Sequence, residues 1–589
     1  MKTEYATKSE KLDFFKSLYE SAKLAYADTE DRLAGYMRQY RGSSEIDGSQ
    51  EAAATVRNIT YEIIESQISS DIPSPKVEPE YYSEQRLRNA HTVERLCYAM
   101  RDRLPFAELN DLDERYTYIY GGSVYHIEWD NTKYEGGVGG VKIECISPLD
   151  FLPQPGVYSV EDMEYCFIRL YTTRGELCRK YGISESECDS AGCEVEYDGA
   201  PPEVDTVTVV ICYYRDERGE VGQFVFSGEL TLFDIPTYYK RKIKLCKRCG
   251  QIEENCLCKT PELVTENQIF ESISKHQLTK YGIYDNVGED FFEGEVGNIP
   301  YYTPNSFPIV IRKNTSAERS LYGQSDCEYI RPEQQAINKI ESRILQKLLR
   351  AGITPVMPED ARVTLNNSVF GQVIKMKPGE SVAQYGKVDT TPNIAQDIAE
   401  AERLYDHSKR ILGISDAYQG IDMNSSESGY AKQLRISQAA GRLNSKKKMK
   451  HTAYAALDRK IFEHYLAFAD EPRAVSYRDA YGRIHNEEFN RYSFIEYDAR
   501  SGEYYYDDSY LFTVDTDGGE EYARESLWQR NLENLRAGTL GEPTDPKSLL
   551  RYWQCQERAH YPYAKENVEY FTEIINRSGG DIYTNGSIL

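Results

Sequence analysis

Four cysteines lie close together in the stretch LCKRCGQIEENCLCK. Cys246, Cys249, Cys256 and Cys258 follow the spacing C-x2-C-x6-C-x-C, and four thiolates so spaced can surround one tetrahedral zinc ion. The closing C-x-C is tighter than the usual zinc-knuckle spacing, so four unconnected thiols are the alternative. Four sulfur ligands would close the coordination shell and leave no position for a reactive water. We therefore expect a structural zinc, not a catalytic one, in an insertion at about residues 240–262.

A second group of residues with chemical potential is cationic. The densest basic run of the chain and its surroundings contain Arg435, Arg442, Lys446, Lys447, Lys448 and Lys450. In a chain whose formal net charge is -25, these side chains are candidates for weak contact with nucleic-acid phosphates. The alternative is that they are solvated or pair with acidic neighbours, as lysine runs on helices commonly do.

A loop rich in serine and glycine precedes the basic run. Its acidic and small residues include Asp416, Asp422, Ser425, Ser426, Glu427, Ser428 and Gly429. The carboxylates would repel a polyanion, and the small residues permit many backbone conformations. An ordinary exposed loop would have a similar composition.

Common catalytic motifs are absent from the sequence. It contains no G-x-x-x-x-G-K-[ST] phosphate loop, no H-E-x-x-H and no G-x-S-x-G. The eight histidines, which include His126, His407, His451 and His464, form no cluster with ligand spacing. We therefore expect that the chain is not an enzyme.

Length and composition indicate a folded chain. Its 589 residues allow about three or four ordinary domains, or fewer large ones. The hydrophobic fraction of 40% fits a packed core better than disorder. No apolar run approaches the roughly 20 residues that cross a bilayer, and the first residues lack the apolar segment of a signal peptide. The sequence thus predicts an intracellular product with reduced thiols and no membrane contact.

Periodicity predicts the elements of the first half. Apolar residues at helical spacing predict helices over 53–72, 84–104 and 106–122. From residue 123 to about 234, short β-branched and aromatic runs predict strands, with a small helix near 174–181. The fold class is therefore mixed α+β.

The second half has a distinctive order of elements. Apolar spacing predicts helices over 333–351 and 393–412, which bracket a β-rich module of roughly 40 residues. The serine-rich loop and one long basic helix, about 429–469, come next. Tyrosine-rich strands and further helices complete the chain.

This order resembles the portal protein of tailed bacteriophages. The likeness covers about residues 298–470: GQSDCEYI leads into AINKIESRILQKLL, and a β excursion, a returning helix, the loop NSSESGYA and a cationic helix follow. The resemblance implies a portal-type fold with these parts: an α+β wing over 1–325, stem helices over 326–352 and 392–413, a clip over 353–391, a tunnel loop over 414–428, a long wing helix over 429–470, a β-rich wing segment over 471–519, and a helical crown and tail over 520–589.

The resemblance also implies a function. Portal proteins form a ring, a dodecamer in the capsid, at one capsid vertex of the virion, and the ring is the channel for packaging and ejection of double-stranded DNA. The implied partners are further copies of the chain, the major capsid protein, the terminase large subunit and a head-tail adaptor protein, with synthesis in the host cytoplasm. The loop residues would line the channel, and the basic run would touch phosphates weakly.

The alternative is a zinc-ribbon-containing nucleic-acid-binding enzyme or accessory protein. It would be a monomer or dimer, and it would lose activity when Cys246 or Cys249 is replaced.

Overall fold

The structure is a computed structural model. It describes residues 8–43, 55–131, 133, 139–188, 191, 206–239, 242–246, 263–267, 270–274, 296–349, 353–356, 386–389, 393–414, 429–469, 471–478, 484–498, 500, 503–515, 521–558, 561, 564, 567–568 and 570–575.

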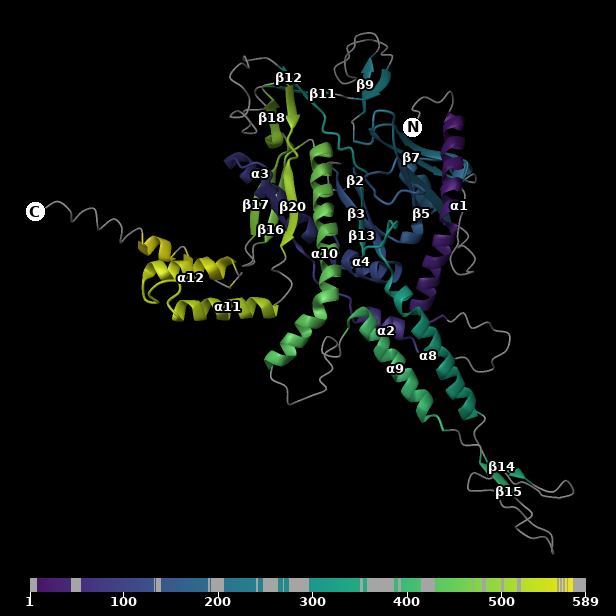
Figure 1. Cartoon of the computed structure of the whole chain (residues 1–589). Helices are drawn as coiled ribbons and strands as arrows, with labels where there is room; N and C mark the ends of the chain where they lie inside the picture. The colour runs from purple at the N-terminus through teal and green to yellow at the C-terminus, as the bar shows by residue number, and fades with distance from the viewer. Residues whose placement is uncertain are drawn as a thin grey trace, which may run out of the picture.

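A five-stranded antiparallel sheet forms one side of the body. Its order is β4 (Phe151–Pro153), β5 (Tyr165–Thr173), β6 (Thr206–Arg215), β7 (Val221–Ser227) and β8 (Leu230–Ile235). The long helix α1 (Lys8–Tyr40) packs along one face through Leu12, Phe15 and Tyr19, and it forms the right-hand edge of the body in Figure 1.

The central strand β6 explains why the sheet has two apolar faces. Val209, Ile211 and Tyr213 point into the main core of the body, whereas the alternating Val210, Cys212 and Tyr214 point toward α1. Successive side chains of a strand face opposite sides, so a strand covered on both sides needs a continuous apolar run. The stretch TVTVVICYY supplies that run.

A three-stranded antiparallel sheet lies next to it. β2 (Gly122–Asp130) stands between β13 (Ile309–Lys313) and β3 (Gly140–Ile146). Along the chain, β2 comes after the helices α3 (Glu84–Arg103) and α4 (Phe106–Tyr120). The 40-residue helix α10 (Gly429–Phe468) crosses this sheet and contacts β13 and β2.

Strand pairs from distant parts of the chain cover the other side of α10. β1 (Ser74–Pro79) pairs with β20 (Tyr510–Asp515), and this pairing ties the first hundred residues to the C-terminal third. The pairs β16 (Arg473–Arg478) with β17 (Ile484–Phe489), and β18 (Ile495–Asp498) with β19 (Glu503–Tyr506), lie beside them. In Figure 1 they form the left-hand side of the body together with α3.

Two helices project from the body. α8 (Asp326–Leu349) and α9 (Ala395–Leu412) run side by side, and the pair β14 (Ile353–Val356) with β15 (Gly386–Asp389) lies at their far end (Figure 1). Ile330 and Ile337 of α8 pack with Tyr405 and Leu412 of α9, and the short helix α2 (Ile59–Glu65) adds Ile63 at the base.

The remaining elements are short or lie beside the body. They are η1 (Pro148–Asp150), α5 (Arg174–Tyr181), α6 (Glu185–Cys188), β9 (Lys242–Cys246), β10 (Leu263–Asn267), β11 (Phe270–Ser274), β12 (Val296–Pro300), η5 (Arg491–Phe494), α11 (Glu521–Arg536) and α12 (Pro546–Arg558). β9 pairs with β10 and β11 pairs with β12, both antiparallel.

The mixed α+β class is confirmed, and one predicted helix is shorter than its pattern. The pattern over 53–72 predicts a helix, but α2 is confined to Ile59–Glu65. Asn58 caps its start by accepting a hydrogen bond from Tyr61 N at 3.0 Å. At its other end, the hydroxyl of Ser66 donates to the Ile63 carbonyl at 2.7 Å. Capping side chains therefore end a helix that apolar spacing alone would continue.

A close backbone contact fixes the start of α8. Gly121 ends α4 with φ of 88°, and a Cβ there would lie 2.3 Å from the carbonyl oxygen of Gly323. Gly323 N donates to the Gly121 carbonyl at 2.8 Å. Only glycine fits both the left-handed conformation and this approach. The GQSD stretch is thereby held against α4, immediately before Asp326 begins α8.

Candidate functional site

The middle of α10 lies over a group of buried charges at the base of α8. We call it the junction network and define it as Asp113, Glu114, Arg312, Asp326, Lys446 and Lys450. These six residues come from α4, β13, α8 and α10, and all are buried.

Lys446 and Asp326 form the first half of the junction network. The ammonium of Lys446 lies 2.6 and 2.9 Å from the two carboxylate oxygens of Asp326. It also donates to Gln67 Oε1 at 3.0 Å and lies 4.9 Å from the centre of the Tyr118 ring. Asp326 accepts further hydrogen bonds from Gln67 at 3.0 Å and from Asn314 at 2.8 Å. Its negative charge also suits the N-terminus of α8.

Lys450 and Glu114 form the second half. The Lys450 ammonium lies 3.0 Å from Glu114 Oε1 and donates to the Asp71 carbonyl at 2.5 Å. Arg312 donates to the same Glu114 oxygen at 2.8 Å and also pairs with Asp113. Each buried charge in this half therefore has an opposite charge in contact, which is the condition for keeping charges out of water.

The pKa values follow this pairing. Burial alone would raise the pKa of Glu114, but the charges of Arg312 and Lys450 outweigh it and hold that pKa below its usual value. Burial lowers the pKa of Lys450, although Glu114 opposes the change. Burial would also lower the pKa of Arg312, yet Asp113 and Glu114 raise it. Glu114 and Arg312 thus remain charged at neutral pH.

The arrangement is suited to holding elements together. The lysines and carboxylates of the junction network are buried and paired with one another, which suits the network to structural support better than to binding a substrate or a phosphate. It connects α10 to the first residue of α8 and to α4, and it can thus set the direction in which the α8–α9 pair leaves the body.

The phosphate-contact prediction is corrected for Lys446 and Lys450. Both are buried and paired with carboxylates, which agrees with the alternative that lysines of this run pair with acidic neighbours. Lys447 and Lys448 are exposed and stay candidates for phosphate contact. Arg435 and Arg442 lie in α10, but their side chains are outside the described part of the structure.

The other predicted sites lie mainly outside the described residues. This holds for Asp416, Asp422, Ser425, Ser426, Glu427 and Ser428, and for Cys249, Cys256 and Cys258. Gly429 is the first residue of α10, and Cys246 is the last residue of β9, with its side chain not described. Most of the predicted clip, 353–391, is also outside, except for β14 and β15.

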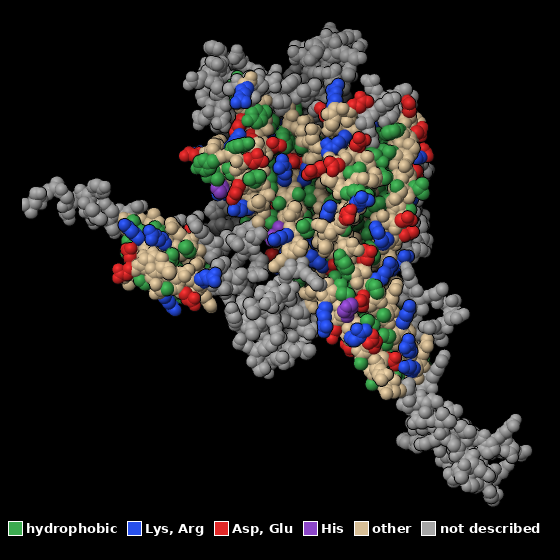
Figure 2. Space-filling view, viewed as in Figure 1, with side chains coloured by type: hydrophobic (Ala, Val, Ile, Leu, Met, Phe, Trp, Pro, Cys, Tyr) green, Lys and Arg blue, Asp and Glu red, His purple; other side chains and the backbone are tan. Residues whose placement is uncertain are grey.

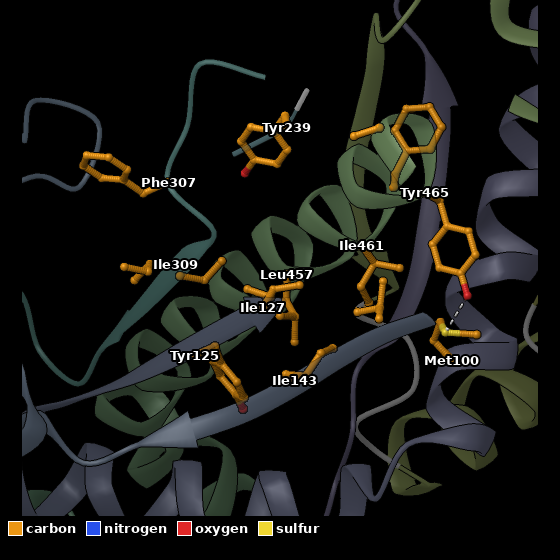
Figure 3. Close-up of a cluster of buried hydrophobic side chains, with 14 of the residues drawn as sticks. Met100, Tyr125, Ile127, Ile143, Tyr239, Phe307, Ile309, Leu457, Ile461 and Tyr465 are labelled. Atoms are coloured by element: carbon orange, nitrogen blue, oxygen red, sulfur yellow. Dashed lines mark hydrogen bonds between the residues drawn. The ribbon is translucent and has the colours of Figure 1, made fainter. Parts of the chain in front are cut away.

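The upper half of α10 has an apolar environment. Figure 3 shows Leu457 and Ile461 beside Ile127 and Ile143, with the Tyr465 hydroxyl 3.4 Å from the sulfur of Met100. Most side chains here lack charge. One exception is Asp458, whose carboxylate binds Arg101 Nη2 at 2.7 and 2.8 Å.

His464 is a buried titratable group in this upper half. Its Nδ1 lies 2.8 Å from the Lys460 carbonyl, and its ring packs near Tyr238, Tyr239 and Phe468. Burial lowers its pKa to about 4, so the ring is neutral at physiological pH.

A groove opens beside α1. It has a volume of about 460 Å³ and lies between α1 and two connections, 153–158 and 317–325. Its lining combines the apolar Tyr26, Leu33, Tyr158 and Leu321 with the charged Arg32, Arg319, Glu318 and Glu328. Nothing in the sequence pattern indicated this groove, because its walls are far apart along the chain.

Sequence reasoning also missed Asp113 and Arg312, which form a buried ion pair within the junction network. The helix FAELNDLDERYTYIY carries a signal that could have found them: Asp113 occupies the apolar stripe four residues after Leu109 and four before Thr117. A carboxylate on a core-facing position needs a buried cation, and Arg312 in β13 is that cation.

Metal and membrane features were also sought in the described ranges. They hold no group of three or more His, Cys, Asp or Glu side chains arranged for a metal ion. Of the helices in these ranges, none is long and apolar enough to span a bilayer.

No family model matches the chain, and no curated protein matches its sequence.

Proposed function

We propose that the chain is a portal protein: a ring-forming, non-enzymatic component of a tailed-phage virion, whose channel passes double-stranded DNA during packaging and ejection. One observation carries the proposal. Two paired helices, α8 and α9, leave an α+β body, hold a strand pair at their far end, and are followed by the 40-residue α10 that crosses the body.

In this proposal, α8 and α9 are the stem, and β14 with β15 belongs to the clip. α10 is the wing helix, the loop 414–428 lines the channel, and α11 with α12 belongs to the crown. The clip would dock terminase and the head-tail adaptor, and the body would meet the major capsid protein. The formal net charge of -25 supports a channel that repels DNA, since a wall that neutralised many phosphates would hold the duplex in place.

The junction network adds a mechanical argument. Asp326 at the start of α8 is bound directly to Lys446 of α10, so stem and wing share a buried contact. Lys447 and Lys448 are left as the exposed cations beside it, and we propose that they make any weak phosphate contact.

Negative-stain electron microscopy of the purified full chain tests the proposal. We expect ring particles with a central hole and the rotational symmetry of a dodecamer, or of a neighbouring number in isolated preparations. Compact monomers or dimers at micromolar concentration would overturn the portal assignment and favour the zinc-ribbon alternative.

A structural zinc at Cys246, Cys249, Cys256 and Cys258 is a separate proposal, supported by their spacing. Elemental analysis of the purified chain should find one zinc ion per chain, and Cys256→Ser should remove most of it. Cys555→Ser is the matched control, because Cys555 is a half-buried free thiol in α12. A chain without zinc, or an unchanged content in Cys256→Ser, would exclude the site.

A further inference from the structure

Strand β13 is an outer strand of its sheet. The order of the sheet is β13-β2-β3, so β2 pairs with only one of the two edges of β13. Figure 3 shows Ile309 on β13, followed by Ile127 of β2 and Ile143 of β3. An outer strand presents backbone N–H and C=O groups that can pair with a further strand. The register decides which residues of β13 direct these groups outward.

The outward groups belong to alternate residues of β13. Ile127 N donates to the Pro308 carbonyl at 2.9 Å. At the other end of the pair, Asn314 N donates to the Gly121 carbonyl at 3.0 Å. In an antiparallel pair, hydrogen-bonded residues alternate with residues whose N–H and C=O groups point away from the partner strand. Even-numbered residues of β13 therefore bond to β2, and the outward groups belong to Ile309, Ile311 and Lys313.

These outward groups have no partner in the described part of the chain. Just beyond β13 the same edge is occupied, because Gln324 N donates to the Thr315 carbonyl at 2.8 Å. Along β13 itself, none of the described residues bonds to the outward groups of Ile309, Ile311 or Lys313. Buried backbone polar groups are nearly always paired. A free edge of five residues is therefore a place where another strand can bind.

A hollow of about 290 Å³ lies along this free edge. Neighbouring residues of a strand face opposite sides, so a hollow that touches Ile309, Val310 and Ile311 together meets the edge of β13 and not one face. The lining also includes the segment 158–161 and, from α10, Ala456 and Lys460. The hollow thus lies where a fourth strand of the sheet would run.

The lining of the hollow specifies an apolar strand. Lys460 is already paired with Glu463 at 2.7 Å, so its charge does not call for a further partner. The remaining lining is mostly apolar and includes Tyr158, Val160, Phe307, Ile309, Ile311 and Leu321. A strand that enters this hollow therefore needs apolar, β-branched side chains.

Lys313 selects among such strands. It is half-buried at the end of the free edge and forms no ion pair with the described residues. A lysine on an edge strand discourages pairing with other chains, unless the residue opposite it carries a negative charge. The exposed Glu161 also lines the hollow and disfavours a second carboxylate. Basic and acidic side chains are intermingled on the face in Figure 2, so this local charge, and not a long-range field, makes the selection.

We propose that β13 binds an extended segment of another protein, which joins the three-stranded sheet as a fourth strand. The inference goes beyond the portal function proposed above and does not depend on it. The segment has about five apolar, β-branched residues, to match the length of β13, and one carboxylate opposite Lys313. It runs antiparallel to β13, the more stable direction and the one used throughout this sheet. Backbone hydrogen bonds give affinity, and side chains give specificity.

A synthetic peptide tests the backbone contact. Its core is Glu-Thr-Val-Val-Ile between Ser-Gly flanks, and fluorescein anisotropy measures its binding to the purified full chain. In the proposed register the glutamate lies opposite Lys313, and the first valine lies opposite Ile311 with its N–H directed at β13. N-methylation of the first valine should weaken binding by about tenfold or more, since it removes that hydrogen bond.

N-methylation of the second valine is the matched control. Its N–H points away from β13, so affinity should change by less than about threefold. Equal losses from the two N-methylated peptides would overturn the proposal, because only strand pairing distinguishes alternate N–H groups. Absence of peptide binding up to about 1 mM would overturn it as well.

Variants of the chain place the contact on β13. Ile311→Pro removes an outward N–H but no bond to β2, so the fold should persist while peptide affinity falls about tenfold. Ile311→Ala separates the loss of the side chain from the loss of the donor. Lys313→Glu should weaken binding of the glutamate peptide and strengthen binding of the same peptide with lysine in place of glutamate.

The charge swap keeps the proposal testable even if Ile311→Pro does not fold. Unchanged affinity in both Ile311→Pro and Lys313→Glu would place the peptide on another sheet edge and overturn the proposal. Absence of ring particles would reject the portal assignment and leave this contact intact.

Discussion

Helix α10 contacts the body through two parts that differ. The lower end of this contact, at the middle of the helix, consists of Lys446 and Lys450, which meet the carboxylates of Asp326 and Glu114 through few and directional contacts. At the upper end, Leu457 and Ile461 pack into a broad apolar cluster, and the buried Arg101–Asp458 pair adds a directional contact. Buried charges thus dominate the first part, and apolar side chains dominate the second.

The difference teaches what each kind of contact can specify. Apolar packing is non-directional, and cores tolerate shifts that conserve volume. A buried ion pair does not tolerate such shifts, because moving one partner leaves the other charge buried and unpaired. The lower end therefore fixes where α8 begins relative to α10, and the upper end supplies most of the apolar burial.

The largest effect should follow from breaking the polar end. Lys446→Met leaves Asp326 buried without its cation, so the free energy of unfolding should fall by about 3–5 kcal/mol. Lys448→Met, two positions along on the exposed side, should change it by less than about 0.5 kcal/mol. Urea unfolding at pH 7 and fixed protein concentration measures both.

A double variant sharpens this test. Lys446→Met with Asp326→Leu removes both charges, and part of the lost stability should return. Recovery should be incomplete, because Gln67 and Asn314 also donate to Asp326 and would lose their acceptor. If Lys446→Met and Lys448→Met lowered the free energy of unfolding equally, the Lys446–Asp326 pair would contribute no more to stability than an exposed lysine.

Truncation at the apolar end should have the next largest effect. Leu457 is fully buried among β2, β3 and α10 residues, so Leu457→Ala should lower the free energy of unfolding by about 2–4 kcal/mol through lost burial and a cavity. The same unfolding experiment checks it. Leu24→Ala, on the exposed face of α1, is the control and should stay within about 0.5 kcal/mol.

These cases show how far the sequence could lead. Helix α5 has the predicted bounds, and α3 and α9 agree with their patterns to within about two residues, because apolar spacing over many residues is a local signal. Helix α8 ends near its predicted end but begins seven residues before the predicted start at 333, so that Pro332 lies inside it. The failure at α2 arose where the side chains of Asn58 and Ser66 compete locally with the pattern.

The candidate site was less predictable for a physical reason. Lys446 and Asp326 are 120 residues apart, and β1 pairs with a strand more than 400 residues later. No local pattern encodes such pairings. The sequence could indicate that the lysines had a role, but whether a lysine met a phosphate or a buried carboxylate depended on the fold around it.

Acid should weaken the upper end through His464. Its pKa is about 4 in the folded chain against 6.5 for an ordinary histidine, so the unfolded chain binds the proton more readily. Its contribution is complete above the ordinary pKa and is lost as pH falls toward 4. Between about pH 7 and pH 5 the free energy of unfolding should fall by about 2 kcal/mol on this account.

Urea unfolding of His464→Gln at a series of pH values isolates the contribution of His464 to the pH dependence of the free energy of unfolding. The variant should lose that part of the pH dependence, whereas His91→Gln, at an exposed position of α3, should keep it. The charged and titratable neighbours of His464 are Lys460, Glu463 and His126, and burial also lowers the pKa of His126. His126→Gln is therefore needed as a parallel variant, and an unchanged slope in His464→Gln would assign the acid sensitivity elsewhere.

The smallest effect should come from removing one polar atom at the apolar end. Tyr465→Phe removes the hydroxyl, which lies 3.4 Å from the Met100 sulfur, and a thioether is a weak acceptor. The free energy of unfolding should change by less than about 1 kcal/mol, since the ring keeps its packing. If this variant were as damaging as Lys446→Met, the upper end would depend on directional contacts beyond the Arg101–Asp458 pair. The two ends of α10 would then differ in composition but not in how they hold the fold.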